Sequence, residues 1–89
     1  MKKVIYSTQF RRDLKRYRNK PKMLQVLVST INMLQYDIIL PETLRPHKLV
    51  GDYQGCMECH VGSDLLLIWR DETTNAIRLM RLGSHSELF

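Results

Sequence analysis

The chain contains three histidines, His47, His60 and His85, all in its second half. Because imidazole titrates near neutral pH, three such side chains brought together can transfer protons at pH 7 without a metal ion or an organic cofactor. A reaction that such groups catalyse needs a general base to remove one proton and a general acid to supply another. Histidine suits both roles.

Basic residues are concentrated at the start of a chain whose net charge is +5. Nine of its 14 Lys and Arg residues lie within the first 22 positions, where Asp13 is the single acid. The rest of the chain carries five basic and eight acidic residues. This asymmetry fits a surface that meets a polyanion, although a solvated helix face would produce the same pattern.

The segment Cys56, Cys59, His60 matches C-x-x-C-H, the attachment pattern of c-type haem. We reject haem because attachment of this kind occurs in exported proteins, whereas the first apolar stretch of this chain is too short for an export signal. Zinc is a stronger alternative, since His47 and His85 add compatible ligands, but a second Cys pair at matching spacing is missing. Reduced cytoplasmic cysteines are the simpler explanation. We therefore expect no metal, no cofactor and a cytoplasmic protein.

A strand and two helices are predicted in the first half. Lys2–Tyr6 is β-branched and aromatic, and Ser7 or Thr8 can cap the helix that follows. That helix has a basic outer face and carries at helical spacing Phe10, Leu14 and Tyr17. Pro21 suits the first turn of a second helix, which runs to about Tyr36. Its apolar stripe consists of Leu24, Leu27, Val28, Ile31 and Leu34.

The second half reads as a loop followed by an antiparallel meander. The loop, 37–46, contains two prolines and delivers His47. Three β-type segments follow, with turns at 62–63 and 71–75: they are 53–61, 65–70 and 76–82. The run Leu65–Trp69 is apolar at every position, which predicts a central strand covered on both faces.

The predicted order is β-α-α-β-β-β. It describes an α+β fold in which two N-terminal helices pack on a small, mostly antiparallel sheet, and residues 1–89 form one domain. Strand alternation puts Glu58 and His60 on one face with Cys56, pointing away from the core. His85 follows the last strand, whose end can bring it near His60.

Sequence elements spread over nearly the whole chain combine into a specific pattern. They are Ile5–Ser7, Phe10, Leu40-Pro41, Pro46–Gly51, Gly55, His60-Val61, Asp64–Trp69, Arg78, Arg81 and Gly83–Phe89. The combination HxL…G, HV…D…LI and G[ST]H…LF resembles the YafQ branch of the RelE superfamily, small bacterial toxins of type II toxin–antitoxin pairs. The resemblance implies a compact RelE-like fold and ribosome-dependent endoribonuclease activity on translated mRNA in the A site of the 70S ribosome. It also implies a cognate antitoxin.

By position, the resemblance implies a catalytic group consisting of His47, His60, Asp64, His85 and Phe89. We expect His85 to be the general acid and His60 or His47 the base. Asp64 is expected to orient a neighbouring imidazole or to raise its pKa. Phe89 either stacks on a nucleobase or plugs the core. The family commonly has a tryptophan where this chain has Leu65, and Trp69 is expected in the core.

Six basic residues are candidates for RNA contacts: Arg81, Lys48, Arg11, Arg12, Lys15 and Arg16. Arg81, just before His85, is the candidate for phosphate stabilisation because its planar fork matches the transition state better than a lysine does. Two alternatives stay open, a toxin of the same fold that inhibits DNA gyrase by binding it, and an RNA-binding domain without cleavage.

Overall fold

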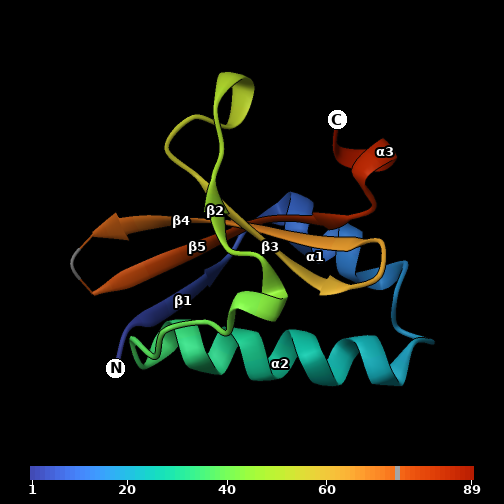
Figure 1. Ribbon diagram of the computed structural model, residues 1–89, viewed down its shortest axis with the longest axis horizontal. Coiled ribbons are helices and arrows are strands. Elements are labelled where there is room, and N and C mark those ends of the chain that lie inside the picture. Colours follow the sequence, from blue (N-terminus) through green and yellow to red (C-terminus); the bar gives the residue numbers. More distant parts are fainter. Residues whose placement is uncertain (74) are drawn as a thin grey trace.

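The computed structural model describes residues 1–73 and 75–89 and consists of one five-stranded sheet with three α-helices (Figure 1). The sheet order is β1-β5-β4-β3-β2, in which β1 pairs with β5 in parallel and every other pair is antiparallel. In chain order the elements are β1 Lys3–Tyr6, α1 Thr8–Lys15, α2 Pro21–Gln35, a 3₁₀ turn Glu42–Leu44, β2 His47–Lys48, a 3₁₀ turn Gly51–Tyr53, β3 Met57–Gly62, β4 Leu65–Thr73, β5 Ala76–Gly83 and α3 His85–Leu88. The predicted α+β class is confirmed.

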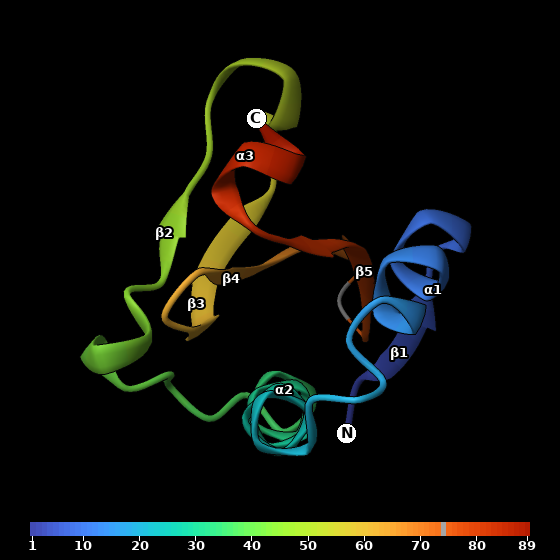
Figure 2. The ribbon, with the colours of Figure 1, turned by 90° about the vertical axis from the view of Figure 1, so that its right-hand side faces the viewer.

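Both predicted helices begin where the sequence indicates. Ser7 is the N-cap of α1, and its Oγ accepts a hydrogen bond of 3.0 Å from the backbone N–H of Phe10. Pro21 occupies the first turn of α2, where the missing N–H costs nothing. Tyr17 lies in the turn after α1, outside the helix predicted to contain it. Helix α2 covers one face of the sheet, and α3 lies on the other (Figure 2).

Strand β4 is central and buried on both faces, as predicted. Leu65, Leu67 and Trp69 enter the larger core with Phe10 of α1 and Leu27 of α2. On the opposite face a smaller core contains Cys56, Leu66, Ile68 and Leu88. The alternation of β4 therefore supplies two cores from one apolar run, and Trp69 is a core residue.

Several predicted boundaries are wrong. Strand β3 begins at Met57 because the preceding chain turns through Gly51 and Gly55, both with positive φ. Strand β4 continues to Thr73 into the predicted turn 71–75, of which Thr74 lies outside the described residues. Val28 is 57% exposed, so it does not belong to the buried stripe of α2.

Two short elements were not predicted. Strand β2 has two residues, too few for an alternation pattern, and adds His47 to the edge of the sheet through its pairing with Glu58. Helix α3 has four residues and starts at a capping box in which Ser84 and Glu87 satisfy each other's backbone N–H groups. No helix within the described parts of the chain is long and apolar enough to cross a membrane.

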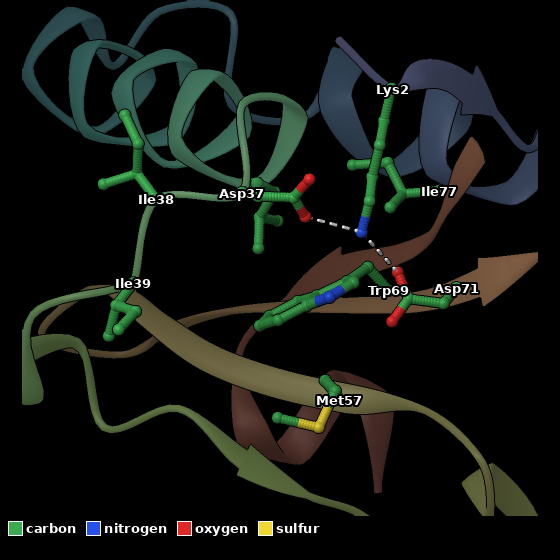
Figure 3. Close-up of a pocket in the computed structure, with 9 residues that line it drawn as sticks. Lys2, Asp37, Ile38, Ile39, Met57, Trp69, Asp71 and Ile77 are labelled. Atoms are coloured by element: carbon green, nitrogen blue, oxygen red, sulfur yellow. Dashed lines mark hydrogen bonds and ion pairs between the residues drawn. The ribbon is translucent and has the colours of Figure 1, made fainter. Parts of the chain in front are cut away.

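A pocket of about 280 Å³ lies at the end of the sheet near the N-terminus (Figure 3). The ammonium group of Lys2 bridges Asp37 at 2.9 Å and Asp71 at 3.5 Å beside the Trp69 ring. The hydrogen bond with Asp37 is the main reason that the pKa of Lys2 is raised. These ion pairs tie the N-terminus to the end of α2 and to β4, and the pocket contains none of the predicted catalytic residues.

Candidate active site

The predicted catalytic residues belong to the sheet face opposite α2 and to its rim. The register places His47, Glu58, Ile68 and Arg81 as successive partners across β2, β3, β4 and β5. A second row runs from His60 through Leu66 to Gly83, directly before α3. The sheet thus brings residues from distant parts of the sequence to one face.

His47 lies against a buried glutamate. Its Nε2 lies 3.0 Å from Oε1 of Glu58, and its Nδ1 lies 2.8 Å from the carbonyl oxygen of Arg45. These two contacts engage both ring nitrogens and so fix the orientation of the imidazole. His47 is therefore held in place at the edge of the sheet face that carries the other candidates.

Glu58 is the functional candidate that the sequence reasoning missed. Its side chain is 6% exposed, and its Oε2 is buried with no hydrogen-bonding partner among the described residues. The prediction that Glu58 points away from the core is wrong because β2 and the smaller core cover this face. The available signal was a carboxylate two residues before His60, on the same side of an alternating strand.

His60 is half-buried on β3, and its side chain has no hydrogen-bonding partner in the part of the chain that the structure describes. Its row ends at Gly83, where a Cβ atom would lie 3.1 Å from Leu88 and 3.2 Å from Glu87. The absence of a side chain at Gly83 allows α3 to fold back over the sheet. This close approach brings α3 to the row of His60.

His85 is the first residue of α3 and is exposed. Its backbone N–H donates to Oδ1 of Asp64 at 3.4 Å, and its ring centroid lies 5.1 Å from that of Phe89. Asp64 was expected to act on an imidazole ring, but the contact observed is with a backbone N–H at the start of a helix. The carboxylate therefore holds the turn before β4 against α3.

Phe89 is 54% exposed and packs edge-on against Tyr53, with the ring centroids 5.5 Å apart. Leu88, and not Phe89, fills the smaller core. Of the two alternatives for Phe89, the core plug is thus wrong. The exposed ring remains available to stack on a base.

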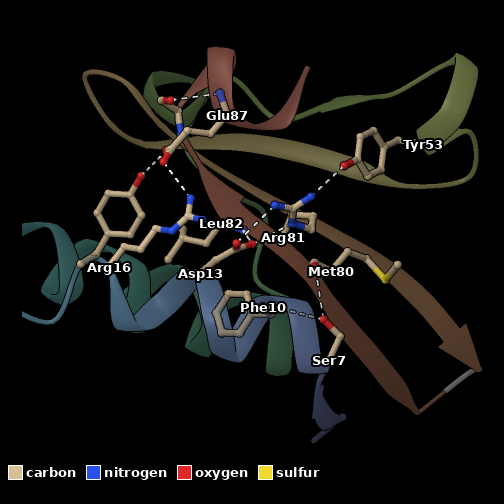
Figure 4. A network of polar contacts seen from close by, with 11 residues as sticks. Ser7, Phe10, Asp13, Arg16, Tyr53, Met80, Arg81, Leu82 and Glu87 are labelled. Atoms are coloured by element: carbon tan, nitrogen blue, oxygen red, sulfur yellow. Dashed lines mark hydrogen bonds and ion pairs between the residues drawn. The ribbon is translucent and has the colours of Figure 1, made fainter.

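Arg81 is engaged by a buried carboxylate (Figure 4). Its Nε and Nη2 donate to Asp13 at 2.8 and 3.2 Å, and Nη1 lies 3.5 Å from the Tyr53 hydroxyl. Asp13 also accepts a hydrogen bond of 2.9 Å from the backbone N–H of Leu82, in the part of β5 that extends past its pairing with β1. The hydrogen bond with Asp13 is the main cause of the raised pKa of Arg81. Only Nη1 is therefore directed toward Tyr53 and the C-terminal residues.

The other basic candidates occupy two separate places. Lys48 is exposed beside His47 on β2, whereas Arg11, Arg12 and Lys15 are exposed on α1. The guanidinium of Arg11 lies 5.7 Å from the centre of the Tyr6 ring. Arg16 differs from these because its Nη1 pairs with Glu87 of α3 at 3.0 Å.

Both cysteines are buried, free thiols that enter different cores. Burial raises the pKa of Cys59 to about 12, so this sulfur stays protonated. Within residues 1–73 and 75–89, no group of three or more His, Cys, Asp or Glu side chains is arranged to hold a metal ion.

The family model of YafQ, described as a bacterial toxin of type II toxin–antitoxin systems, matches residues 2–89. A putative toxin YafQ of Haemophilus influenzae is 34% identical, covering 96% of this chain and 89% of the relative. The mRNA interferase toxin YafQ of Escherichia coli K12 is 30% identical over 97% of this chain and 94% of the relative. This chain belongs to the YafQ family of type II toxins.

Solved structures agree with this assignment. A crystal structure of YafQ from E. coli BL21(DE3) superposes with a TM-score of 0.88 at 28% identity and covers 100% of this chain and 99% of that one. A metal-bound toxin from Helicobacter pylori gives a TM-score of 0.89 at 34% identity, with all of both chains covered. E. coli YafQ has also been solved in complex with DinJ; that structure gives a TM-score of 0.86 at 29% identity and covers 100% of this chain and 99% of that one.

Proposed function

We propose that this toxin is a ribosome-dependent endoribonuclease that cleaves translated mRNA in the A site of the 70S ribosome, in the cytoplasm. The E. coli relatives are named mRNA interferase toxins. The observation that carries the proposal is the placement of His47, His60 and α3 with His85 around one sheet face, with Phe89 exposed beside it. Imidazoles placed there can supply acid–base chemistry without a metal ion.

The geometry favours a division of roles among the histidines. His60, whose side chain has no hydrogen-bonding partner among the described residues, is the base that takes the 2′-hydroxyl proton. The exposed His85 is the acid that protonates the 5′-oxygen. His47, held in place by Glu58 and the Arg45 carbonyl, stabilises the phosphorane. Each general acid or base contributes roughly 10²–10⁴-fold to the rate.

The ends of the RNA products test this mechanism. Attack by the 2′-hydroxyl leaves a 2′,3′-cyclic phosphate and a 5′-hydroxyl, which enzymatic end-labelling and mass spectrometry detect. Intact RNA combined with inhibited DNA gyrase would instead support the binding toxin of the same fold. The three histidines argue against that alternative, because inhibition by binding does not require groups that transfer protons.

A cognate antitoxin is part of the proposal. The E. coli relative is solved in complex with an antitoxin, DinJ. The exposed basic residues of α1 suit a negatively charged, partly disordered segment that folds on binding. Expression of such a partner together with the toxin is expected to restore growth.

A further inference from the structure

The helix that carries His85 is too short to be stable alone. Helix α3 has four residues, whereas isolated helices of fewer than about 12–15 residues are marginal in water. Leu88 anchors one side of α3 in the smaller core. The orientation of His85 therefore depends on the contacts made by the rest of this single turn.

Glu87 makes the polar contacts that hold α3. Its Oε1 accepts from the Tyr17 hydroxyl at 2.6 Å and from the backbone N–H of Ser84 at 2.8 Å, and its Oε2 accepts from Arg16 at 3.0 Å (Figure 4). These donors hold the pKa of Glu87 at about 2, with the Ser84 N–H as the largest cause. One carboxylate thus joins the residues that follow α1 to the cap that precedes His85.

We propose that Tyr17 is a positioning residue for His85, acting through its hydrogen bond with Glu87. Tyr17 is half-buried against the larger core, so its hydroxyl has a defined position. Arg16, whose side chain is 62% exposed, provides a weaker constraint. The inference rests on the proposed catalytic role of His85. It adds to the active site a positioning residue that lies 68 positions earlier in the sequence, in the turn after α1.

The substitution Tyr17→Phe tests the inference because it removes the hydroxyl and retains the ring. We expect the cleavage rate at saturating ribosome complex to fall about tenfold or more, with KM changed less than twofold, since a displaced catalytic group lowers the chemical step. Tyr36→Phe is the matched control, because Tyr36 is exposed at the end of α2. An unchanged cleavage rate in Tyr17→Phe would overturn the inference.

A measurement on the free toxin separates this inference from the proposed function. In NMR spectra, Tyr17→Phe is expected to shift the ring resonances of His85 while those of His47 and His60 stay in place. Shifts at all three histidines would instead indicate a general loss of structure, and no shift at His85 would contradict the positioning role. These NMR shifts can be measured without RNA cleavage. A toxin that cuts no RNA would therefore refute the proposed function and leave the positioning role of Tyr17 to be decided by the shifts.

Rescue by a conservative variant provides the second test. Glu87→Gln keeps acceptor oxygen for Tyr17 and for the Ser84 N–H, whereas Glu87→Ala keeps none. We expect the His85 resonances and the cleavage rate of Glu87→Gln to lie closer to the wild type than those of Glu87→Ala. Equal behaviour of the two variants would show that the hydrogen bonds of Glu87 do not position His85.

Discussion

At the scale of single residues, the buried Glu58 determines how His47 is oriented. An imidazole whose two nitrogens face a carbonyl and a carboxylate is held in one orientation. The second carboxylate oxygen, buried without a partner among the described residues, makes removal of the His47 contact costly.

Glu58→Gln is expected to weaken the contact that orients His47, because the amide has one acceptor oxygen and no charge. ¹⁵N spectra should show a shift of the His47 ring resonances in the variant, while those of His85 stay in place. Cleavage should fall about 10- to 100-fold. Glu42→Gln, in an exposed 3₁₀ turn, is the control. Identical His47 spectra in wild type and Glu58→Gln would refute this pairing.

At the scale of elements, α1 has two functions that its amphipathic pattern combines. Its inner side supplies Phe10 to the larger core and Asp13 to Arg81 and Leu82. Its outer side exposes Arg11, Arg12 and Lys15. The helix therefore connects a basic surface with the residues that hold β5 and α3.

Replacement of Arg11, Arg12 and Lys15 by Gln should weaken association with ribosomes and reduce its salt dependence. With fewer phosphate contacts, binding releases fewer counterions from the RNA. Binding measured between about 50 and 200 mM salt tests this expectation. The reference is Lys3→Gln, on β1. Unchanged affinity and salt slope in the triple variant would exclude this surface from ribosome binding.

The anchoring of α3 is expected to depend on pH through Glu87. The pKa of its carboxyl is about 2 in the folded protein, below the ordinary value of 4.5. A lowered pKa means that Glu87 stabilises the fold above about pH 4.5 and that this contribution is lost as pH falls toward 2. The difference in unfolding free energy between wild type and Glu87→Gln, measured by urea denaturation, should therefore shrink below pH 4.5. A difference constant from pH 7 to pH 3 would contradict the assignment.

At the scale of the whole molecule, one face of the sheet contributes mainly to the core and the other carries the candidate site. The larger core, under α1 and α2, contains most buried apolar side chains, whereas the opposite face carries the smaller core and the candidate site. This division explains how far the sequence could predict the structure. Pro21 and the apolar run of β4 are local signals, and they located α2 and the central strand correctly.

The parts that the sequence could not predict depend on contacts between distant segments. Glu58 looks like an exposed strand residue until β2 pairs beside it, and two residues are too few to show that pairing in advance. Arg81 looks like a free cation until Asp13, from α1, engages it. The resemblance to a known family supplied the histidines and Phe89, but it did not reveal these partners.

The most direct test of the central claim is primer extension on two versions of one reporter mRNA, with and without its start codon, after expression of wild type or His85→Ala in bacteria. We predict cleavage of the translated message only, and its loss in His85→Ala. Cleavage of both messages, or full cleavage by His85→Ala, would contradict a ribosome-dependent ribonuclease that uses His85 as its acid.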